Sequence, residues 1–369
     1  MKKTALDTIS GKAAAMDVYD QKGSMLIKAG TCAAESSIQK LKDSGIPFIY
    51  TRDADIKVSS IYEGSTIAEL LKVLWYYKSA GGQKSELLKR YSIEEVKRFI
   101  SYSKESSTKL AWGHIFGYFA ARIIKEMKKG GKQCYDFQDY RSLESYNNFH
   151  GVNCACISAA IGYNMGLNGG ELSELITGAL LSDAKMELFG FVDEKRELSH
   201  SETEEMRTHT FAGFEAVRGT YGISSMSAAI VLRHHERHDG SGYPKGLKTA
   251  EIPLPARIAA VADVYDSMTS HRPFREGYLP EEAWEFIAIN SGKLFDPDVV
   301  SEFKRTVPKF MPGDTVETKR GDKAVIGKNF YGRAEDPGII IIEKTGQSVI
   351  ISSGERAENP AVKTTLSIR

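Results

Sequence analysis

The sequence predicts a multidomain, mainly α-helical protein, in which an all-helical domain follows a small α+β module and connecting helices and precedes a small β unit. Three observations carry this prediction. Between about residues 61 and 307, apolar residues recur at intervals of three and four, which is the period of amphipathic helices. At both ends of the chain, short apolar runs separated by glycines are typical of strands. A length of 369 residues suggests two or three structural units.

Residues 1–60 predict the small α+β module. Residues 17–27 have the pattern of a hairpin, residues 36–43 that of a short helix and residues 48–50 that of a strand. No group of ligand-type side chains is visible in this module. We therefore favour a packing platform over a sensory role.

Residues 61–135 predict connecting helices, because apolar residues such as Ile67, Leu70 and Leu74 lie three and four positions apart. Such helices could form a dimerising or signal-transmitting bundle, but a helix that packs on its own domain is the commoner arrangement. We expect an aromatic cluster near the end of this region to be core: Trp112, Phe116, Tyr118 and Phe119.

Residues 136–307 have a helical pattern almost throughout, with Gly166, Gly169 and Gly170 marking a helix end. After Pro308 the pattern changes to short apolar runs separated by glycines, so residues 308–369 predict a small β unit. We interpret this last unit as structural.

The composition indicates a cytoplasmic protein. A net charge of +1 lacks the basic footprint of a general nucleic-acid binder. No apolar run reaches the roughly 18 residues of a membrane helix, and the amino terminus has no apolar core of a signal peptide. The four cysteines have no framework spacing, so we expect reduced thiols.

A histidine-rich motif indicates a candidate metal site. Residues 234–244 read His-His-Glu-Arg-His-Asp-Gly-Ser-Gly-Tyr-Pro. Imidazoles and carboxylates together suit first-row metals such as iron, manganese or zinc, and the two glycines let the backbone approach a charged ligand. By itself, a histidine pair is as often a polar surface feature. Further potential ligands lie at separations that a helical domain can bring together: His150, Asp183, His209 and Asp263.

From about residue 140 to residue 307, the chain resembles the HD-GYP domains, bacterial metal-dependent phosphodiesterases of the HD superfamily that open cyclic di-GMP. The strongest part of the resemblance is the motif at 234–244. It continues in four later segments, at residues 252–253, 256–258, 263–266 and 272–275. Weaker matches lie at residues 146–150, 206–213 and 295–297.

The resemblance implies two divalent ions, iron or manganese first of all, with Asp183 bridging them. The implied metal ligands are His150, Asp183, His209, His234, His235 and Asp263. The three-metal members of the family also use a glutamate at the position of Tyr146, so a two-metal site is expected here.

Substrate contacts are implied for Tyr243, Arg272 and Arg275. Tyr243 offers an aromatic face, and the arginines offer forked donors to phosphate. The residues alone support the alternatives equally: a turn residue for Tyr243, and salt bridges to Asp266 or Glu276 for the arginines.

Two positions depart from the family pattern. Ser182 replaces the histidine of the name-giving His-Asp pair, which weakens one metal position because a hydroxyl is a poorer ligand than an imidazole. The resemblance implies a catalytic lysine near the scissile phosphate, but Lys185 stands one place early and Met186 holds its position. One helical step is about 100°, so Lys185 is expected to point elsewhere unless the helix ends locally.

Three functions follow as hypotheses. The favoured one is a phosphodiesterase for cyclic di-GMP in bacterial signalling, in which Asp183 and Lys185 are catalytic. The second is a degenerate domain that binds a cyclic dinucleotide or partner proteins without cutting. The third is a phosphodiesterase for another cyclic dinucleotide, such as cyclic GMP-AMP. A homodimer or a signalling protein is a possible partner in each.

Overall fold

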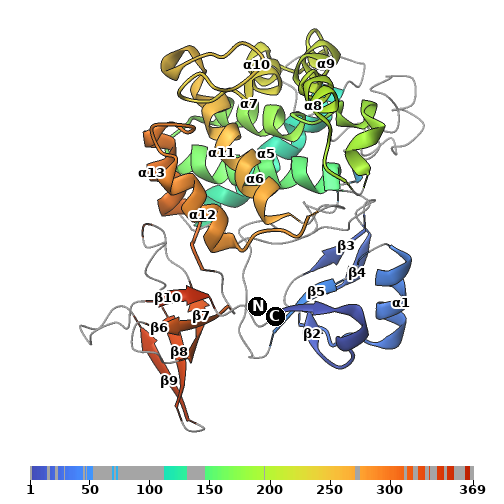
Figure 1. Cartoon of the computed structure of the whole chain (residues 1–369), viewed down its shortest axis with the longest axis vertical. Coiled ribbons are helices and arrows are strands. Elements are labelled where there is room, and N and C mark those ends of the chain that lie inside the picture. Colours follow the sequence, from blue (N-terminus) through green and yellow to red (C-terminus); the bar gives the residue numbers. More distant parts are fainter. Residues whose placement is uncertain are drawn as a thin grey trace.

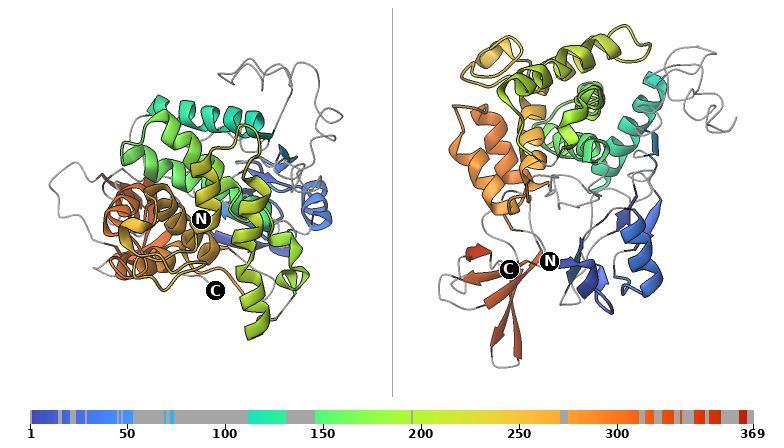
Figure 2. Two further views of the ribbon diagram at one scale, coloured as in Figure 1. Left: turned by 90° about the horizontal axis from the view of Figure 1, so that it is seen from above. Right: turned by 45° about the vertical axis from the view of Figure 1, so that its right-hand side comes forward.

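The structure is a computed structural model of the chain. It describes residues 2–52 with short gaps at 15–16, 21–23, 29, 45 and 47, residues 69, 72–73, 112–130, 146–194, 196–270 and 275–310, and parts of 314–365. Figure 1 and the right view of Figure 2 show the helices of residues 112–306 (α5 to α13) gathered in one body, with two small units below it: one of strands β1 to β5 with helix α1 (residues 2–52), and one of strands β6 to β10 (residues 315–365). The described part of the chain is mostly helical, which confirms the predicted fold class.

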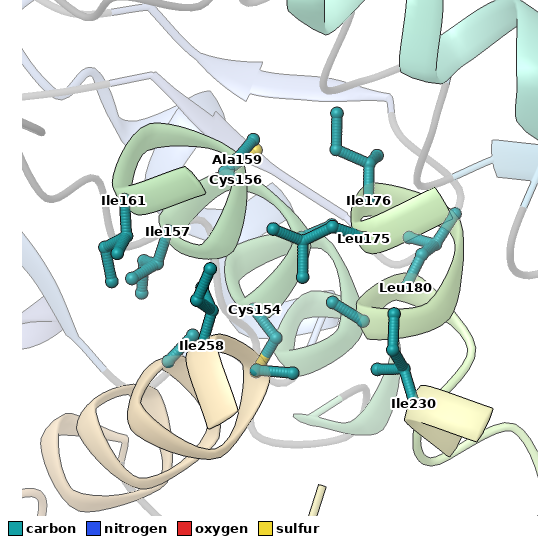
Figure 3. Packing of buried hydrophobic residues seen from close by; sticks show 14 of the residues in the cluster. Cys154, Cys156, Ile157, Ala159, Ile161, Leu175, Ile176, Leu180, Ile230 and Ile258 are labelled. Atoms are coloured by element: carbon teal, nitrogen blue, oxygen red, sulfur yellow. The ribbon is translucent and has the colours of Figure 1, made fainter. Parts of the chain in front are cut away.

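The helical body is built around α6 (Tyr146–Asn164), which packs against α5, α7, α11 and α13. The other helices are α5 (Trp112–Gly130), α7 (Gly169–Leu180), α8 (His200–Arg207), α9 (His209–Val217), α10 (Ser225–Arg233), α11 (Leu254–Thr269), α12 (Pro280–Ile289) and α13 (Pro297–Thr306). Helix α6 is apolar on most of its circumference, as expected of a helix with neighbours on several sides. Its side chains meet those of α7, α10 and α11 in one continuous core (Figure 3).

Polar caps set the helix starts. Asn168 accepts hydrogen bonds from the backbone N–H groups of Gly170 and Glu171, and the Glu171 side chain accepts one from the Asn168 N–H. Because of this capping box, α7 begins at Gly169, so the expectation that Gly169 and Gly170 mark a helix end is wrong for these two glycines. Gly166, with a φ of +89°, does lie just beyond the end of α6.

The aromatic cluster of α5 is buried, as predicted. Trp112, Phe116, Tyr118 and Phe119 are each at most 6% exposed and belong to the same core as α6 and α7. Helix α5 therefore packs on the helical domain. Apart from residues 69, 72 and 73, the connecting helices predicted between 61 and 111 lie outside the described residues. The predicted domain boundaries, after residues 60, 135 and 307, remain a proposal.

The first 52 residues form the small module with a core of its own. Strands β1 (Lys2–Ala5), β5 (Phe48–Arg52) and β2 (Ala13–Ala14) make an antiparallel sheet in that order, beside a hairpin of β3 (Val18–Tyr19) and β4 (Met25–Ile27). Helix α1 (Glu35–Asp43) packs against this hairpin through β4. The predicted hairpin, helix and later strand are confirmed, and β1 and β2 are elements that the sequence analysis did not predict.

The last strands form an antiparallel sheet in the order β10-β6-β7-β8-β9. Their bounds are β6 (Thr315–Thr318), β7 (Lys323–Lys328), β8 (Ile339–Lys344), β9 (Gln347–Ser352) and β10 (Val362–Thr365). The short apolar runs after Pro308 supply the first four of these strands, β6 to β9. Strand β10 was missed because Val362 is the one aliphatic side chain within its bounds.

No helix among the described residues is both long enough and apolar enough to span a membrane.

Candidate metal centre

The six predicted ligands meet in one cluster, although three helices and two turns supply them. His150 lies in the first turns of α6, and Asp183 lies in the turn that follows α7. His209 begins α9, His234 and His235 follow α10, and Asp263 lies in α11.

Asp183 occupies the middle of this cluster. Its Oδ2 lies 3.5 Å from His150 Nε2. Its Oδ1 lies 3.5 Å from His209 Nε2 and 3.6 Å from His234 Nε2. The two oxygens of one carboxylate thus face two different sets of imidazoles, which is the arrangement that a bridging ligand requires.

Asp263 makes a second link across the cluster. Its Oδ1 lies 3.1 Å from His150 Nε2, and its Oδ2 lies 3.6 Å from His235 Nδ1. One donor atom from each of four side chains also falls within 4.8 Å of the others: Asp183, His209, His234 and His235.

Neighbouring acceptors fix the orientation of three imidazoles. His209 Nδ1 donates to the Met206 carbonyl at 2.7 Å, and His234 Nδ1 donates to the Val231 carbonyl at 2.9 Å. Each Nε2 then keeps its lone pair, which is the form that binds a metal. His150 Nδ1 lies 2.8 Å from Asp266 Oδ2, the same arrangement with a carboxylate as acceptor.

Asp266 is a functional neighbour that sequence reasoning did not identify. It is fully buried, and its other oxygen accepts a hydrogen bond from Asn153 Nδ2 at 2.8 Å. Asp266 lies one helical turn after Asp263, and Asn153 lies one turn after His150. The spacing of three residues was therefore a usable signal, because it places both pairs on shared helix faces.

Burial shapes the charge of the cluster. Desolvation lowers the pKa values of His209 and His235 below the ordinary histidine value, so both imidazoles are neutral near pH 7. Burial alone would raise the pKa of Asp183, but His234 and the other surrounding imidazoles hold that pKa well below its usual range. Ionised carboxylates beside neutral imidazoles are ready to bind a cation without first losing protons.

The residues present fit a divalent ion. Asp183 Oδ1 is buried and has no hydrogen-bond partner among the described residues. A buried ionised oxygen without a partner is costly, and a cation between it and the two Nε2 atoms would satisfy it. Mixed oxygen and nitrogen donors suit iron, manganese or zinc.

Comparison with known proteins agrees with this geometry. Residues 158–299 match the model of a family described as HD domain. A cyclic di-GMP phosphodiesterase of Thermotoga maritima is 38% identical over 170 residues, 45% of each chain. The helical domain therefore contains an HD domain, similar to that of cyclic di-GMP phosphodiesterases. A cyclic di-GMP phosphodiesterase response regulator of Xanthomonas campestris is 43% identical over 109 residues, 29% of each chain. A 3'3'-cGAMP-specific phosphodiesterase of Vibrio cholerae is 62% identical over 63 residues, 16% of this chain and 15% of that one. The chain covers less than half the length of each of these relatives.

Ser182 stands where the HD-GYP pattern described above has the histidine of its His-Asp pair. Its side chain is buried, and Oγ donates a hydrogen bond to the Ala179 carbonyl at 2.9 Å. The hydroxyl is thus engaged with the end of α7. The carboxylates within 4 Å of His150 Nε2 are those of Asp183 and Asp263.

Lys185 follows the end of α7 and precedes a short 3-10 turn, Met186–Leu188, so the helix does end locally. The argument from one helical step therefore does not apply to Lys185. Its proposed catalytic role stays untested. Arg272 lies outside the described residues.

Arg275 and Tyr243 are placed differently from one another. Arg275 donates to the Ser267 carbonyl at 2.9 Å and lies 4.9 Å from the ring centroid of Tyr278, so its head group is engaged within its own segment. Tyr243 stacks on His235 with ring centroids 4.7 Å apart. Tyr243 therefore borders the cluster directly, and both substrate contacts remain predictions.

Glu236 holds the loop that carries Tyr243, a role that sequence reasoning missed. Its two carboxylate oxygens accept hydrogen bonds from the backbone N–H groups of Lys245 at 2.8 Å and Leu247 at 2.9 Å. A glutamate that is 1% exposed is stable only when so paired. An acidic residue inside the motif was the available signal.

Replacing Gly242 with alanine is expected to destabilise the domain by roughly 2 kcal/mol or more. A Cβ at this position would collide with the backbone nitrogen of Arg237 and the carbonyl oxygen of His235, and backbone atoms cannot move aside cheaply. Urea denaturation measures the effect. Gly190→Ala is the matched control, because a Cβ there meets nothing within 4 Å. Equal stability of the two variants would contradict the prediction.

Acidification is expected to lower the free energy of unfolding of the metal-free protein. The pKa values of His209 and His235 are lower in the folded chain than in the unfolded one, so below about pH 6.5 only the unfolded chain takes up these protons. Each such histidine then costs up to about 1.4 kcal/mol per pH unit. Urea denaturation between pH 7.5 and pH 5.5 measures the slope. His235→Gln should make it shallower, whereas a variant of the exposed His200 should not.

Proposed function

We propose that this chain hydrolyses a phosphodiester bond of a cyclic dinucleotide, most directly cyclic di-GMP, with two divalent ions held by the six side chains described above. The observation that carries the proposal is the Asp183 carboxylate, whose two oxygens face His150 on one side and His209 and His234 on the other. The cyclic di-GMP phosphodiesterases among the relatives support this choice of substrate. Iron and manganese are the proposed ions.

The chain's own residues would prepare this reaction. Asp183 and Asp263 place negative charge where two cations are needed, and the neutral imidazoles add donors without adding charge. Asp266 fixes the ring of His150 and raises its basicity as a ligand. Two divalent ions at such a site supply Lewis acidity toward the phosphate group and the attacking water.

The two metal positions are proposed to differ in affinity. One has Asp183 with three imidazoles, and the other has His150 with two carboxylates beside the buried thiol of Cys154, whose Sγ lies 3.6 Å from His150 Nε2. Burial raises the pKa of that thiol to about 12, which makes it a poor ligand. Loss of an imidazole ligand should cost at least as much as loss of an outer partner, roughly 10- to 100-fold in affinity. The position beside His150 is therefore the weaker one.

Two other functions each have a supporting observation. The engagement of Ser182 with Ala179 favours a degenerate domain that binds a cyclic dinucleotide or a protein without cutting. The 62% identity with a 3'3'-cGAMP-specific phosphodiesterase over 63 residues favours cyclic GMP-AMP as substrate.

The deciding experiment is turnover of cyclic di-GMP and cyclic GMP-AMP by protein purified without oxygen and loaded with ferrous iron or manganese. Chromatography identifies the products, and metal is quantified on the same sample. Product would support the proposal and name the substrate. Bound metal without product from either substrate would favour a binding role, and absence of both metal and product would overturn the proposed activity.

A further inference from the structure

Arg207 brings a cation to the edge of the metal centre. It is the last residue of α8, two positions before His209. Its guanidinium carbon lies 5.2 Å from the ring centroid of Tyr243, and Tyr243 in turn stacks on His235. The side chain of Arg207 is 45% exposed, whereas that of His209 is fully buried. One aromatic ring therefore separates a solvent-accessible guanidinium from the cluster.

Two other arginines near this site have their head groups engaged with carbonyls. Arg237 is half-buried and donates through one nitrogen to the carbonyls of His234 and Glu236. Arg275 donates to the Ser267 carbonyl. Arg207 instead forms an exposed ion pair with Glu204 at 2.6 Å, which uses one of its two terminal nitrogens. Exposed pairs of this kind are weak, and within the described part of the chain the Arg207 guanidinium makes no other hydrogen bond, so the remaining donors of the fork are available to an anion.

The charge of the centre points to what that anion is. Two divalent ions would exceed the charge of the Asp183 and Asp263 carboxylates, so the loaded site attracts a phosphate. A cyclic dinucleotide carries two phosphates on opposite sides of its ring. When one of them lies at the ions, the other needs a cation some distance away. A guanidinium is suited to this because its planar fork matches phosphate oxygens.

We propose that Arg207 binds the phosphate that is not cleaved, and so helps the site to select cyclic dinucleotides over substrates with a single phosphate. This inference rests on the proposed function. Arg207 acts in binding and makes no contact with the reacting atoms. Its removal should therefore raise KM and leave kcat unchanged.

The test compares three variants. Arg207→Met keeps an aliphatic stem over Tyr243 and removes the charge, and Arg207→Lys keeps the charge. Arg218→Met is the matched control, because Arg218 also pairs with a glutamate three residues earlier, Glu215 at 2.7 Å, and also lies over an aromatic ring, that of Phe214 at 5.7 Å. Metal content is measured for every variant.

For Arg207→Met we expect KM for cyclic di-GMP to rise about tenfold, with kcat within about twofold of the wild type. KM for bis(p-nitrophenyl) phosphate, which has a single phosphate, should not change. Calorimetry with a non-hydrolysable phosphorothioate analogue of cyclic di-GMP should give a matching loss of affinity. Arg207→Lys should restore most of the wild-type KM for cyclic di-GMP and most of the affinity for the analogue. Arg218→Met should resemble the wild type in both measurements.

Equal behaviour of Arg207→Met and Arg218→Met, in protein that binds metal and cleaves both substrates, would overturn this inference and leave the proposed function standing. A loss that affects both substrates alike would also overturn it, because it would assign Arg207 a structural role at Tyr243. A wild-type protein that takes up no metal would overturn the proposed function together with the inference.

Discussion

Replacement of Asp183 with asparagine is expected to remove bound metal and to lower turnover of cyclic di-GMP about 1000-fold. The asparagine side chain would keep the shape of Asp183 but lose the charge and one of the two oxygens that face separate sets of imidazoles. Both proposed ions would lose a ligand at once. If each loss costs at least roughly 10- to 100-fold, the combined effect is on the order of 1000-fold. Elemental analysis after desalting and chromatography of the products measure the two effects.

Asp239→Asn is the control for this change. Asp239 lies in the same motif but is exposed, and its side chain accepts hydrogen bonds from the backbone and hydroxyl of Ser241. An amide oxygen can accept these bonds too, so metal content and turnover should stay near those of the wild type. Full metal content in folded Asp183→Asn protein would rule out the bridging role.

Replacement of Ser182 with histidine is expected to increase metal binding and turnover. An imidazole at this position would give the ion beside His150 a fourth side-chain ligand. We expect metal content to approach two ions per chain, and metal affinity at that position and turnover to rise roughly 10- to 100-fold. Because Ser182 is 2% exposed, the larger side chain also strains the packing, at a cost of about 1–3 kcal/mol. Metal titration measures the gain in metal affinity, and a melting curve of the metal-free protein measures the loss of stability.

Ser182→Ala is the control: it removes the hydroxyl without adding an imidazole, so it tests whether loss of the hydroxyl alone changes metal binding. The Ser182 hydroxyl donates to the Ala179 carbonyl, so its removal should leave metal content unchanged. A folded Ser182→His variant without additional metal would show that the missing imidazole is not what limits this position.

The candidate ligands could be predicted from the sequence because each stands in a motif. The structure brings all six together, and their assignment as ligands remains a prediction. The side chains that support them could not be predicted in the same way. Asp266 and Glu236 have the same residue type as many solvated acids, and only the packing of α6 on α11 and the closure of the loop at 240–247 show what they contact. Such contacts depend on tertiary structure, which local sequence does not encode.

Dependence on tertiary contacts also explains which elements of the fold could be predicted from the sequence. The long helices were predictable because their apolar periodicity repeats over several turns. Strands β1 and β10 are each four residues long and form by pairing with β5 and β6, which lie far along the chain. Apolar and polar residues do not alternate clearly enough in these segments to predict a strand. The start of α7 was misplaced because Asn168 caps the helix across two glycines that the sequence suggested as a terminator.

The distance along the chain between His150 and Asp263 has a consequence for folding. These residues are 113 positions apart, and their side chains meet only when α6 and α11 have docked. An ion held between them would bind the closed domain and not the open chain, and would stabilise it by about 4 kcal/mol when free metal exceeds the dissociation constant about 1000-fold. Metal supply would then act on the lifetime of the protein as well as on its chemistry. When iron or manganese is scarce, more of the domain would be metal-free, and this less stable form would open more often and be cleaved faster by proteases.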